Sequence, residues 1–529
     1  MSLLGRVVSN AGRAARLGVA RIALRRAPVV LRLRLASPLP ELAPPAFFGG
    51  AEPALSLLET LLVLRRAARD PDVAALAVRL EGPPGGLARA LSLRRALAEA
   101  AREKPVLVWA ESLSSEELLA ASAATRLLVP ESGSVLLVGL RYEGVFLREL
   151  LDKLGVAPEV VRVGAFKSAG EMLTRSSLSP EQRAQLEALL DDHFEALVQG
   201  IAEGRRLAPE AVRACVEAGP FTAPAARDAG LIDACRYPDE VPDQLRELAP
   251  ALAGRDPLPL VDARLYLALR AADPGWAPLA RELPALVYVV ARGAIVRGRG
   301  HRGVAVDTYR RLLDRLAEDE RVSAVVLRID SPGGEVVASD LLWRALQQLG
   351  RKKPVVASLG DTAASGGYYV AAAAQAIVAE AATLTGSIGV VGGKLDLSGL
   401  YERLGVGRDG VERGARAGMF TDARGFSPEE RKVVREGMES AYERFVARVA
   451  EGRALPAERV LEAAGGRVFS GSAALARGLV DALGGPLEAI AEALRRAGVD
   501  PDAGVALGVA PRLPRFGGLR DWLRFLPVP

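Results

Sequence analysis

Histidine and cysteine are scarce in this chain of 529 residues, which contains two of each. A typical zinc site or a disulfide framework needs more of these side chains, so we expect neither a metal ion nor a disulfide scaffold. Cys215 and Cys235 are expected to be free thiols. A Ser-His-Asp triad would have to use His193 or His301, and both lie in polar stretches typical of a protein surface. No Walker-A pattern occurs either, and no cofactor is predicted.

Long apolar runs are also missing, because no stretch reaches the 18 or more residues that a membrane span requires. Residues 1–40 contain eight arginines and no acidic residue, whereas the rest of the chain is slightly acidic. A nucleic-acid-binding body would carry its own basic face, so no nucleic-acid partner is expected. Within residues 1–28, apolar residues recur at helical spacing between the arginines. This pattern predicts either a basic amphipathic helix on an anionic membrane surface or a frayed or self-packed helix.

The most informative feature of the sequence is an internal repeat. Residues 71–136 resemble residues 321–385, and Lys104 aligns with Lys353 at an offset of 249 residues. Both copies also end alike, in Gly-Leu-Ile-Asp and Gly-Leu-Val-Asp. A chain of this length is too long for one ordinary core, so the repeat predicts two similar domains.

Each copy lacks a residue that the other keeps. At the offset of 249 residues, Ser365 of the second copy aligns with Glu116 of the first. Slightly further on, at an offset of 250 residues, Lys167 of the first copy aligns with Ala417 of the second. Reciprocal loss of this kind is what a duplicated enzyme would show if its halves now share one active site.

Strand-like apolar runs, Gly/Pro turns and helical patterns alternate in both copies, which predicts an α/β fold with parallel sheets and crossover connections. The predicted organisation comprises a basic amphipathic leader (1–28), an N-terminal repeat (29–247), a Pro-rich connection (248–284), a C-terminal repeat (285–500) and a tail (501–529). The N-terminal repeat is expected to contribute Lys167 and the C-terminal repeat Ser365.

Ser365 lies in Gly-Asp-Thr-Ala-Ala-Ser-Gly-Gly-Tyr, between an apolar strand-like run and a helical run. A serine at a strand-to-helix turn has two interpretations. It is either the N-cap of the helix, which is a common role for serine, or a nucleophile exposed at the turn. Gly366 and Gly367 permit the tight turn and the close approach of a substrate in the second case.

Lys167 is one of only seven lysines, against 62 arginines, and lies in a turn flanked by apolar residues. An arginine cannot act as a base, whereas a desolvated lysine can have its pKa lowered toward neutrality. The alternative is an ordinary surface lysine paired with Glu171. Because neither histidine is a plausible base, Lys167 is the remaining candidate to activate Ser365.

An oxyanion also needs fixed N–H donors. The Ser-Pro-Gly-Gly turn that ends at Gly334 follows an apolar strand-like run, so it is either a plain β-turn or the source of one donor. The N–H of Gly366 is the candidate for the second donor.

Four stretches together carry a resemblance to a known family. They are DSPGGE (330–335), GDTAASGGYYVAAAA (360–374), TLTGSIGVVGG (383–393) and RVGAFKSAGE (162–171). From about residue 29 to residue 500 the chain resembles the long, duplicated form of signal peptide peptidase A, a Ser-Lys protease family. The resemblance implies two tandem ClpP/crotonase-like β-α repeat domains with parallel sheets.

The resemblance also implies roles for individual residues. Ser365 corresponds to the nucleophile of the family, Lys167 to its general base, and Ser387 to a serine that hydrogen-bonds the lysine amine. The family clears cleaved signal peptides and other short or unfolded apolar peptides without ATP, and it typically forms a membrane-attached homotetramer. A bacterial inner-membrane location is therefore expected, peripheral or anchored through the N-terminus.

One departure from the family and two alternatives remain open. Long family members commonly carry an N-terminal transmembrane anchor, whereas residues 1–28 read only as a basic amphipathic leader, so a cytoplasmic location is the alternative. A crotonase-like enzyme acting on acyl-CoA shares the superfold but usually employs carboxylate bases. A catalytically inactive scaffold is the third possibility.

Overall fold

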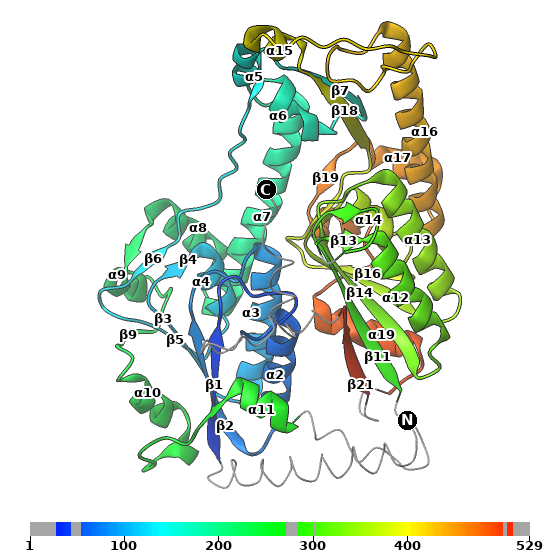
Figure 1. Ribbon diagram of the computed structural model, residues 1–529. Coiled ribbons are helices and arrows are strands. Elements are labelled where there is room, and N and C mark those ends of the chain that lie inside the picture. Colours follow the sequence, from blue (N-terminus) through cyan, green and yellow to red (C-terminus); the bar gives the residue numbers. More distant parts are fainter. Residues whose placement is uncertain (1–27, 44–53, 271–283, 301, 501–504, 512–529) are drawn as a thin grey trace.

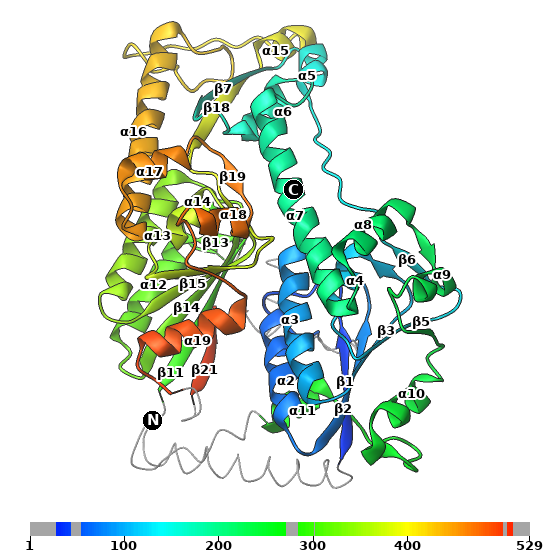
Figure 2. The same cartoon turned by 180° about the vertical axis from the view of Figure 1, so that it is seen from behind.

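The computed structural model describes residues 28–43, 54–270, 284–300, 302–500 and 505–511, which form two α/β lobes connected by a shared layer (Figure 1). Figure 2 shows the same arrangement from behind. Residues 1–27 of the predicted leader and His301 lie outside the described residues. Within the described ranges, no helix combines the length and apolar character needed to cross a membrane.

The first lobe is built on a six-stranded parallel sheet with strand order β10-β1-β2-β3-β5-β9. Its strands are β1 (Val29–Leu35), β2 (Val73–Leu80), β3 (Val106–Ala110), β5 (Arg126–Val129), β9 (Ala234–Cys235) and β10 (Leu260–Asp262). Because side chains alternate across a strand, Leu31 and Leu33 face the helices α2 (Leu57–Arg69) and α3 (Leu87–Glu103), whereas Val30 faces α10 (Val241–Leu248).

The remaining elements of the N-terminal half are short strands and surrounding helices. They are β4 (Leu113–Ser114), α4 (Ser115–Ala121), β6 (Ser134–Leu136), α5 (Arg148–Leu154), β7 (Ala157–Val163), α6 (Glu171–Thr174), α7 (Pro180–Arg205), α8 (Pro209–Ala218), β8 (Phe221–Thr222), α9 (Ala223–Asp228) and α11 (Ala263–Arg270).

The second lobe contains the larger sheet, with order β19-β17-β15-β14-β11-β21 and with β16 and β20 off this path. Only the β17–β19 pairing is antiparallel among its described pairs. The strands are β11 (Ala285–Arg292), β14 (Val322–Ser331), β15 (Val355–Ala364), β16 (Ala376–Ala379), β17 (Leu384–Gly386), β19 (Val468–Phe469), β20 (Ala482–Leu483) and β21 (Ala506–Ala510).

Helices on the outer side cover one face of this second sheet. The other elements of this half are β12 (Ile295–Val296), β13 (Val304–Ala305), α12 (Val306–Glu318), α13 (Val336–Gly350), α14 (Gly366–Ala371), β18 (Val390–Asp396), α15 (Ser398–Leu404), α16 (Pro428–Arg453), α17 (Ala457–Glu462), α18 (Gly471–Ala476) and α19 (Pro486–Arg496). Val289 and Leu327 pack under α12 and α13. The predicted α/β class with tandem repeats and parallel sheets is confirmed.

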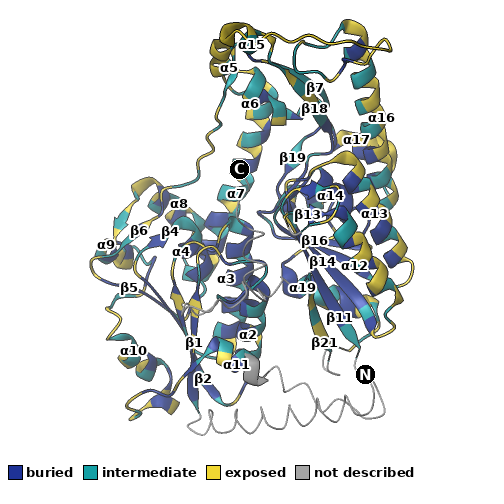
Figure 3. Cartoon of the chain, in the orientation of Figure 1, coloured by how far each residue is buried: buried dark blue, intermediate teal, exposed yellow. Residues whose placement is uncertain are grey.

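A single apolar core continues from one lobe into the other. The opposite face of the second sheet, with Tyr288 and Val326, packs in the same cluster as α2, α3 and α19. Figure 3 shows the strands of both sheets and the helix faces between the lobes largely buried. The two lobes are thus held as one body by an extensive apolar contact.

The shared layer above the lobes is made from corresponding segments of both repeats. β7 pairs antiparallel with β18, from Val163 opposite Val390 to Ala157 opposite Asp396. The helices α7 and α16, both 26 residues long, start with a capping serine followed by proline and run from this layer down to the lobes (Figure 1). Segments of the first repeat thereby reach the second lobe.

Two predicted boundaries differ from the structure. Part of the predicted connection (248–284) belongs to the first lobe, since β10 adds to the edge of β1 and α11 packs against β1 and α2. Part of the predicted tail (501–529) belongs to the second sheet, because β21 pairs with β11. Short edge strands with few alternating residues give little periodic signal, which explains both errors. Residues 271–283, 501–504 and 512–529 lie outside the described residues.

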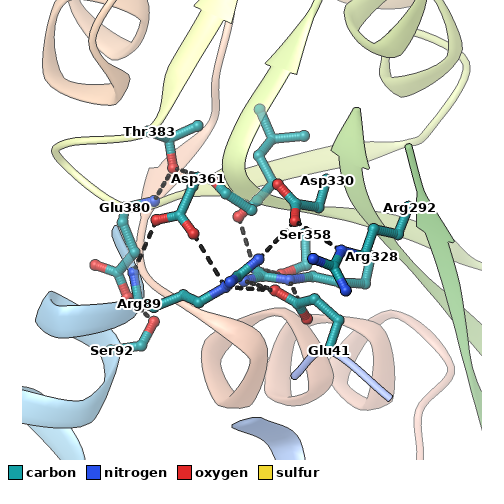
Figure 4. A network of polar contacts seen from close by, with 12 residues as sticks. Glu41, Arg89, Ser92, Arg292, Arg328, Asp330, Ser358, Asp361, Glu380 and Thr383 are labelled. Atoms are coloured by element: carbon teal, nitrogen blue, oxygen red, sulfur yellow. Dashed lines mark hydrogen bonds and ion pairs between the residues drawn. The ribbon is translucent and has the colours of Figure 1, made fainter. Parts of the chain in front are cut away.

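A buried ion pair between the lobes accompanies the apolar core (Figure 4). Arg328 on β14 donates to both carboxylate oxygens of Glu41, at 3.1 and 3.0 Å, and each side chain is 1% exposed. Arg328 also donates to the carbonyl of Leu359 at 2.6 Å. Glu41 follows β1 of the first lobe, so this pair ties the first strand of one lobe to the centre of the other.

We expect Glu41→Ala to lower the free energy of unfolding by about 3–5 kcal/mol, because it leaves a buried guanidinium without its counter-charge. The ion pair between Arg34 and Glu81 provides a matched control, because it is more accessible to solvent. The Arg34 side chain is 52% exposed and the Glu81 side chain is 33% exposed. Glu81→Ala should change stability by no more than about 1 kcal/mol. Urea unfolding followed by circular dichroism measures both, and equal losses in the two variants would contradict this account.

Candidate active site

Ser365 lies at the junction of β15 and the short helix α14, as the sequence predicts. The strand ends at Ala364 and the helix begins at Gly366. Ser365 has φ 53° and ψ −120°, a conformation that non-glycine residues rarely adopt. The backbone holds it there through Ser365 N–H, which donates to Gly386 O at 2.9 Å, and Ser365 O, which accepts from Tyr369 N–H at 2.9 Å.

The Ser365 side chain contacts a residue of the other repeat and does not cap the helix that follows it. The Ser365 side chain makes no capping hydrogen bond to α14. Its hydroxyl oxygen instead lies 2.9 Å from Nζ of Lys167, a residue of the other repeat. Ser365 occupies the N-cap position in the chain without performing the capping function.

Lys167 reaches the second lobe on the turn that follows β7. Phe166 N–H donates to Gly465 O at 2.9 Å, which joins this turn to the second repeat. A Cβ on Gly466 would lie 2.5 Å from Lys167 N, and one on Gly389 would lie 3.2 Å from its Cδ. A side chain on Gly466 would collide with the Lys167 backbone, and one on Gly389 would collide with Gly466 Cα at 2.9 Å. Glycines of the second repeat thus allow the Lys167 turn of the first to approach closely.

The Lys167 amine is buried and has no acidic partner among its recorded interactions. The residue is 5% exposed, and burial alone lowers the pKa of Lys167 to about 8. A lysine with a pKa near 8 is partly neutral at neutral pH and can accept a proton. The alternative of a surface lysine paired with Glu171 is wrong, because Glu171 instead binds Arg162 at 2.5 Å and Ser179 Oγ at 3.0 Å.

Ser387 completes the surroundings of the amine. It follows β17, whose Gly386 pairs with Ala364 beside the nucleophile candidate. Lys167 Nζ lies 2.9 Å from Ser387 Oγ and 2.9 Å from Ser387 O. Ser387 also has a positive φ of 54°, and its N–H donates to Arg467 O at 2.7 Å. Three oxygens therefore orient one lysine amine.

Two glycine turns meet next to Ser365. A Cβ on Gly333 would lie 2.7 Å from Gly366 N and 2.9 Å from Ser365 Cβ, while one on Gly366 would lie 3.1 Å from Gly334 N. The backbone N–H groups of Gly334 and Gly366 are thus close to each other and to the serine. Gly366 is the first residue of α14, where an N–H has no acceptor within the helix.

A cavity of about 430 Å³ opens beside Lys167 and Ser387. Its walls are a mixture of polar and apolar groups, and the residues that line it are Tyr142, Glu143, Gly144, Val145, Phe146, Phe166, Lys167, Ser168, Ala169, Met172, Gln182, Gln185, Ser387, Gly466 and Val468. Much of this lining comes from the extended segment between β6 and α5, which runs up the side of the molecule in Figure 1. Val145 is 66% exposed, an unusual exposure for a large apolar side chain.

Most of this lining is not predictable from local sequence patterns. Its only signal is a stretch, Leu-Arg-Tyr-Glu-Gly-Val-Phe, with apolar residues but neither strand nor helix periodicity. The pairing of this segment with a site on the other repeat depends on the path of the chain between the lobes, which local patterns do not contain.

The residues aligned with Ser365 and Lys167 in the opposite copies have no such surroundings. Glu116 lies in the first turn of α4, where the backbone N–H groups of Gly85 and Gly86 hydrogen-bond its carboxylate. Ala417 is in an exposed loop between α15 and α16. One complete serine–lysine contact therefore exists within the described part of the chain. His193, on α7, is half-buried and interacts with the backbone of Ala382.

Comparison with known proteins supports the interpretation of the chain as an internal repeat. The model of peptidase family S49 matches the chain twice, at residues 98–251 and 347–500. The two matches are offset by 249 residues, as Lys104 and Lys353 are. Together they cover more than half of the chain.

Individual relatives lie in the same family. The chain is 34% identical over 408 residues to a chloroplastic serine protease SPPA of Arabidopsis thaliana, an alignment that covers 76% of this chain but 60% of that protein. It is 31% identical to Protease 4 of Salmonella typhi, with 78% and 67% covered, and 30% identical to Protease 4 of Haemophilus influenzae, with 78% and 68% covered. The double match of the family model and these relatives show that this chain belongs to peptidase family S49.

Proposed function

We propose that this protein is a serine endopeptidase that cleaves short or unfolded apolar peptides, cleaved signal peptides among them, without ATP. The observation that carries the proposal is the 2.9 Å contact between Lys167 Nζ and Ser365 Oγ, with the lysine buried and lacking an acidic partner. Membership of a peptidase family favours this proposal over the crotonase-like alternative. Relatives named serine protease SPPA and Protease 4 support it further.

In the proposed first step, neutral Lys167 accepts the proton of the Ser365 hydroxyl while Oγ attacks the carbonyl carbon of the peptide bond. The carbonyl oxygen becomes an oxyanion, for which the N–H groups of Gly334 and Gly366 are the candidate donors. The resulting Lys167 ammonium remains held by Ser387 and then gives its proton to the leaving amine. The C–N bond breaks, and the N-terminal part of the peptide stays esterified to Ser365.

In the second step, a water molecule replaces the leaving amine. Neutral Lys167 takes a proton from this water, which attacks the ester carbonyl, and the ammonium returns the proton to Ser365 Oγ as the C–O bond breaks. Ser387 restrains the amine through both steps by its hydroxyl and carbonyl oxygens. The cavity lined by Val145, Phe146 and Met172 supports a preference for substrates with apolar side chains.

We also propose that the protein works as a homotetramer. Large apolar side chains are exposed at the end of α15 and in the loop that follows it, where Leu404 is 67%, Val411 88% and Phe420 73% exposed. Exposed apolar groups of this kind are typical of surfaces that bind other chains. Sedimentation equilibrium should give the mass of four chains.

The first prediction concerns pH. Below the lowered pKa of Lys167 the amine is protonated and cannot act as a base, so kcat/KM should rise with pH and level off above a midpoint of about 8. The measurement is the cleavage rate of a fluorogenic apolar peptide at low substrate concentration across this pH range. A flat profile from about pH 6 to about pH 10 would remove lysine from the role of base.

The second prediction concerns the residues themselves. Ser365→Ala, Lys167→Ala and Lys167→Arg should each lower kcat by more than about 1,000-fold, the last because a guanidinium stays protonated. Circular dichroism should show all three folded. His193→Gln is the matched control and should keep near-normal rates, because the proposed mechanism does not employ histidine. A Lys167→Arg enzyme with substantial activity, or an inactive His193→Gln enzyme, would refute the Ser-Lys assignment.

The third prediction concerns the membrane, which we propose the protein contacts through residues 1–28. The six arginines of this segment and the helical spacing of its apolar residues support attachment to an anionic surface. Deleting residues 1–28 should abolish binding to vesicles containing phosphatidylserine while leaving peptide cleavage intact, since β1 begins at Val29. High salt should weaken binding of the full-length protein. Full-length protein that ignores these vesicles at low salt would exclude this attachment.

A further inference from the structure

Arg89 connects the first repeat to two acidic residues of the second. It lies in the first turn of α3, and its side chain is 5% exposed. Its guanidinium donates to Asp330 Oδ2 at 2.6 Å and forms an ion pair with Asp361 Oδ2 at 3.0 Å. Figure 4 shows Arg89 pointing from its helix into the group formed by these carboxylates and Glu41.

Both carboxylates belong to strand ends that carry parts of the candidate active site. Asp330 directly precedes the Ser-Pro-Gly-Gly turn that ends at Gly334. Asp361 lies on β15, four residues before Ser365. Asp330 Oδ1 also accepts from Thr362 N–H at 3.3 Å, so the two strand ends are joined to each other as well as to Arg89.

The backbone of α3 takes part in the same contact. Asp361 Oδ1 accepts from Arg89 N–H at 3.2 Å, which gives this helix an N-terminal cap from the other repeat. The N-cap residue of the helix, Gly86, has no side chain of its own to cap it, and a Cβ there would lie 2.2 Å from Asp361 Oδ1. Glycine at this position is what allows the carboxylate to approach.

This region of the first repeat is the counterpart of the oxyanion turn in the second. Gly85 and Gly86 follow β2 as Gly333 and Gly334 follow β14. In the first repeat the turn is filled by Glu116, the counterpart of Ser365, which accepts from the N–H groups of both glycines. In the first repeat, the position that corresponds to the candidate active site is therefore occupied by the Glu116 carboxylate. The first turn of α3, with the charged Arg89, faces the second repeat instead.

A second arginine and Glu41 fix the orientation of Arg89. Glu41 Oε1 accepts from Arg89 Nε at 3.4 Å and from Arg328 at 3.0 Å, so one carboxylate lies between the two guanidinium groups. Without Arg89, Asp330 would keep a longer ion pair of 3.8 Å with the exposed Arg292. Asp330 and Asp361 would then repel each other more strongly as partly buried like charges, which costs free energy.

We propose that Arg89 is a positioning residue that holds the oxyanion turn and the Ser365 turn of the second repeat in register. This inference rests on the proposed peptidase function. A guanidinium suits the task because its planar donors bind two carboxylates in fixed directions, which a lysine ammonium does less well. Displacing either turn by about 1 Å is enough to lower turnover by about 100-fold.

Arg95 offers a control on the same helix. It crosses the same boundary between the repeats and pairs with Glu380 at 2.6 Å and Glu488 at 3.0 Å, yet neither partner lies on the Gly334 or Ser365 turn. If Arg89 acts only by holding the lobes together, Arg95→Met should have a comparable effect on turnover.

The experiment measures four variants of the full chain: Arg89→Met, Arg89→Lys, Arg95→Met and Asp330→Asn. A fluorophosphonate label counts the sites that react, and kcat and KM for an apolar peptide and Ki for a peptide aldehyde are measured on the same samples. For Arg89→Met we expect an unchanged labelled fraction, a kcat lower by about 10–100-fold, a KM within about threefold, and a Ki that rises with the loss of kcat/KM. Arg89→Lys should recover part of kcat, and Arg95→Met should stay within about twofold of the parent.

Several outcomes would overturn the inference. An unchanged kcat in Arg89→Met, a loss explained wholly by fewer labelled sites, or an equal loss in Arg95→Met each contradicts positioning by Arg89. If Arg89→Met does not fold, Asp330→Asn decides, because it keeps an oxygen for the bond from Thr362 and weakens the ion pairs of Asp330 with Arg89 and Arg292. An unchanged kcat there overturns the proposal. A parent protein that neither takes the label nor cleaves peptide contradicts the proposed function itself, whereas an active parent does not.

Discussion

The contact between the Lys167 amine and the Ser365 hydroxyl exists only while the two repeats keep one fixed relative position. The atoms are 2.9 Å apart and belong to segments 198 residues apart in the chain. Because the buried amine has no acidic partner among its recorded interactions, it provides no ion pair that would draw the lobes together. The rest of the structure supplies that attraction, through an apolar core continuous between the lobes, the β7–β18 pairing and the buried Arg328–Glu41 pair.

The two repeats contribute different parts of one candidate active site. The second repeat keeps the strained backbone at Ser365 and Ser387, with φ values of 53° and 54°, and such strain persists only where surrounding structure enforces it. The first repeat delivers Lys167 and fills its own corresponding turn with Glu116. Its helix α3 and Arg89 then lie against the strand ends that lead to the site.

The sequence is most informative where the chemistry depends on single residues. The reciprocal replacement of Ser365 by Glu116 and of Lys167 by Ala417 predicts a shared site without any knowledge of the fold. Other features depend on contacts between distant segments. A helix N-cap and a nucleophile can both be a serine at this strand-to-helix turn, so the local sequence cannot distinguish the two roles of Ser365. The position of the Lys167 amine is what favours one over the other. Arg89 and Glu41 look like ordinary surface charges in a chain so rich in both signs. The short edge strands β10 and β21 have too few residues for their periodicity to be read.

The most direct test of the shared site is complementation between two inactive full-length chains. Ser365→Ala and Lys167→Ala variants, carrying different affinity tags, are produced together and purified through both tags, so that every assembly contains both chains. If each site is built within one chain, every site carries one defect, and the mixed assemblies should cleave peptide no faster than either variant alone. Recovery of a substantial fraction of the parent rate would mean that serine and lysine meet between neighbouring chains, and it would contradict the arrangement described above.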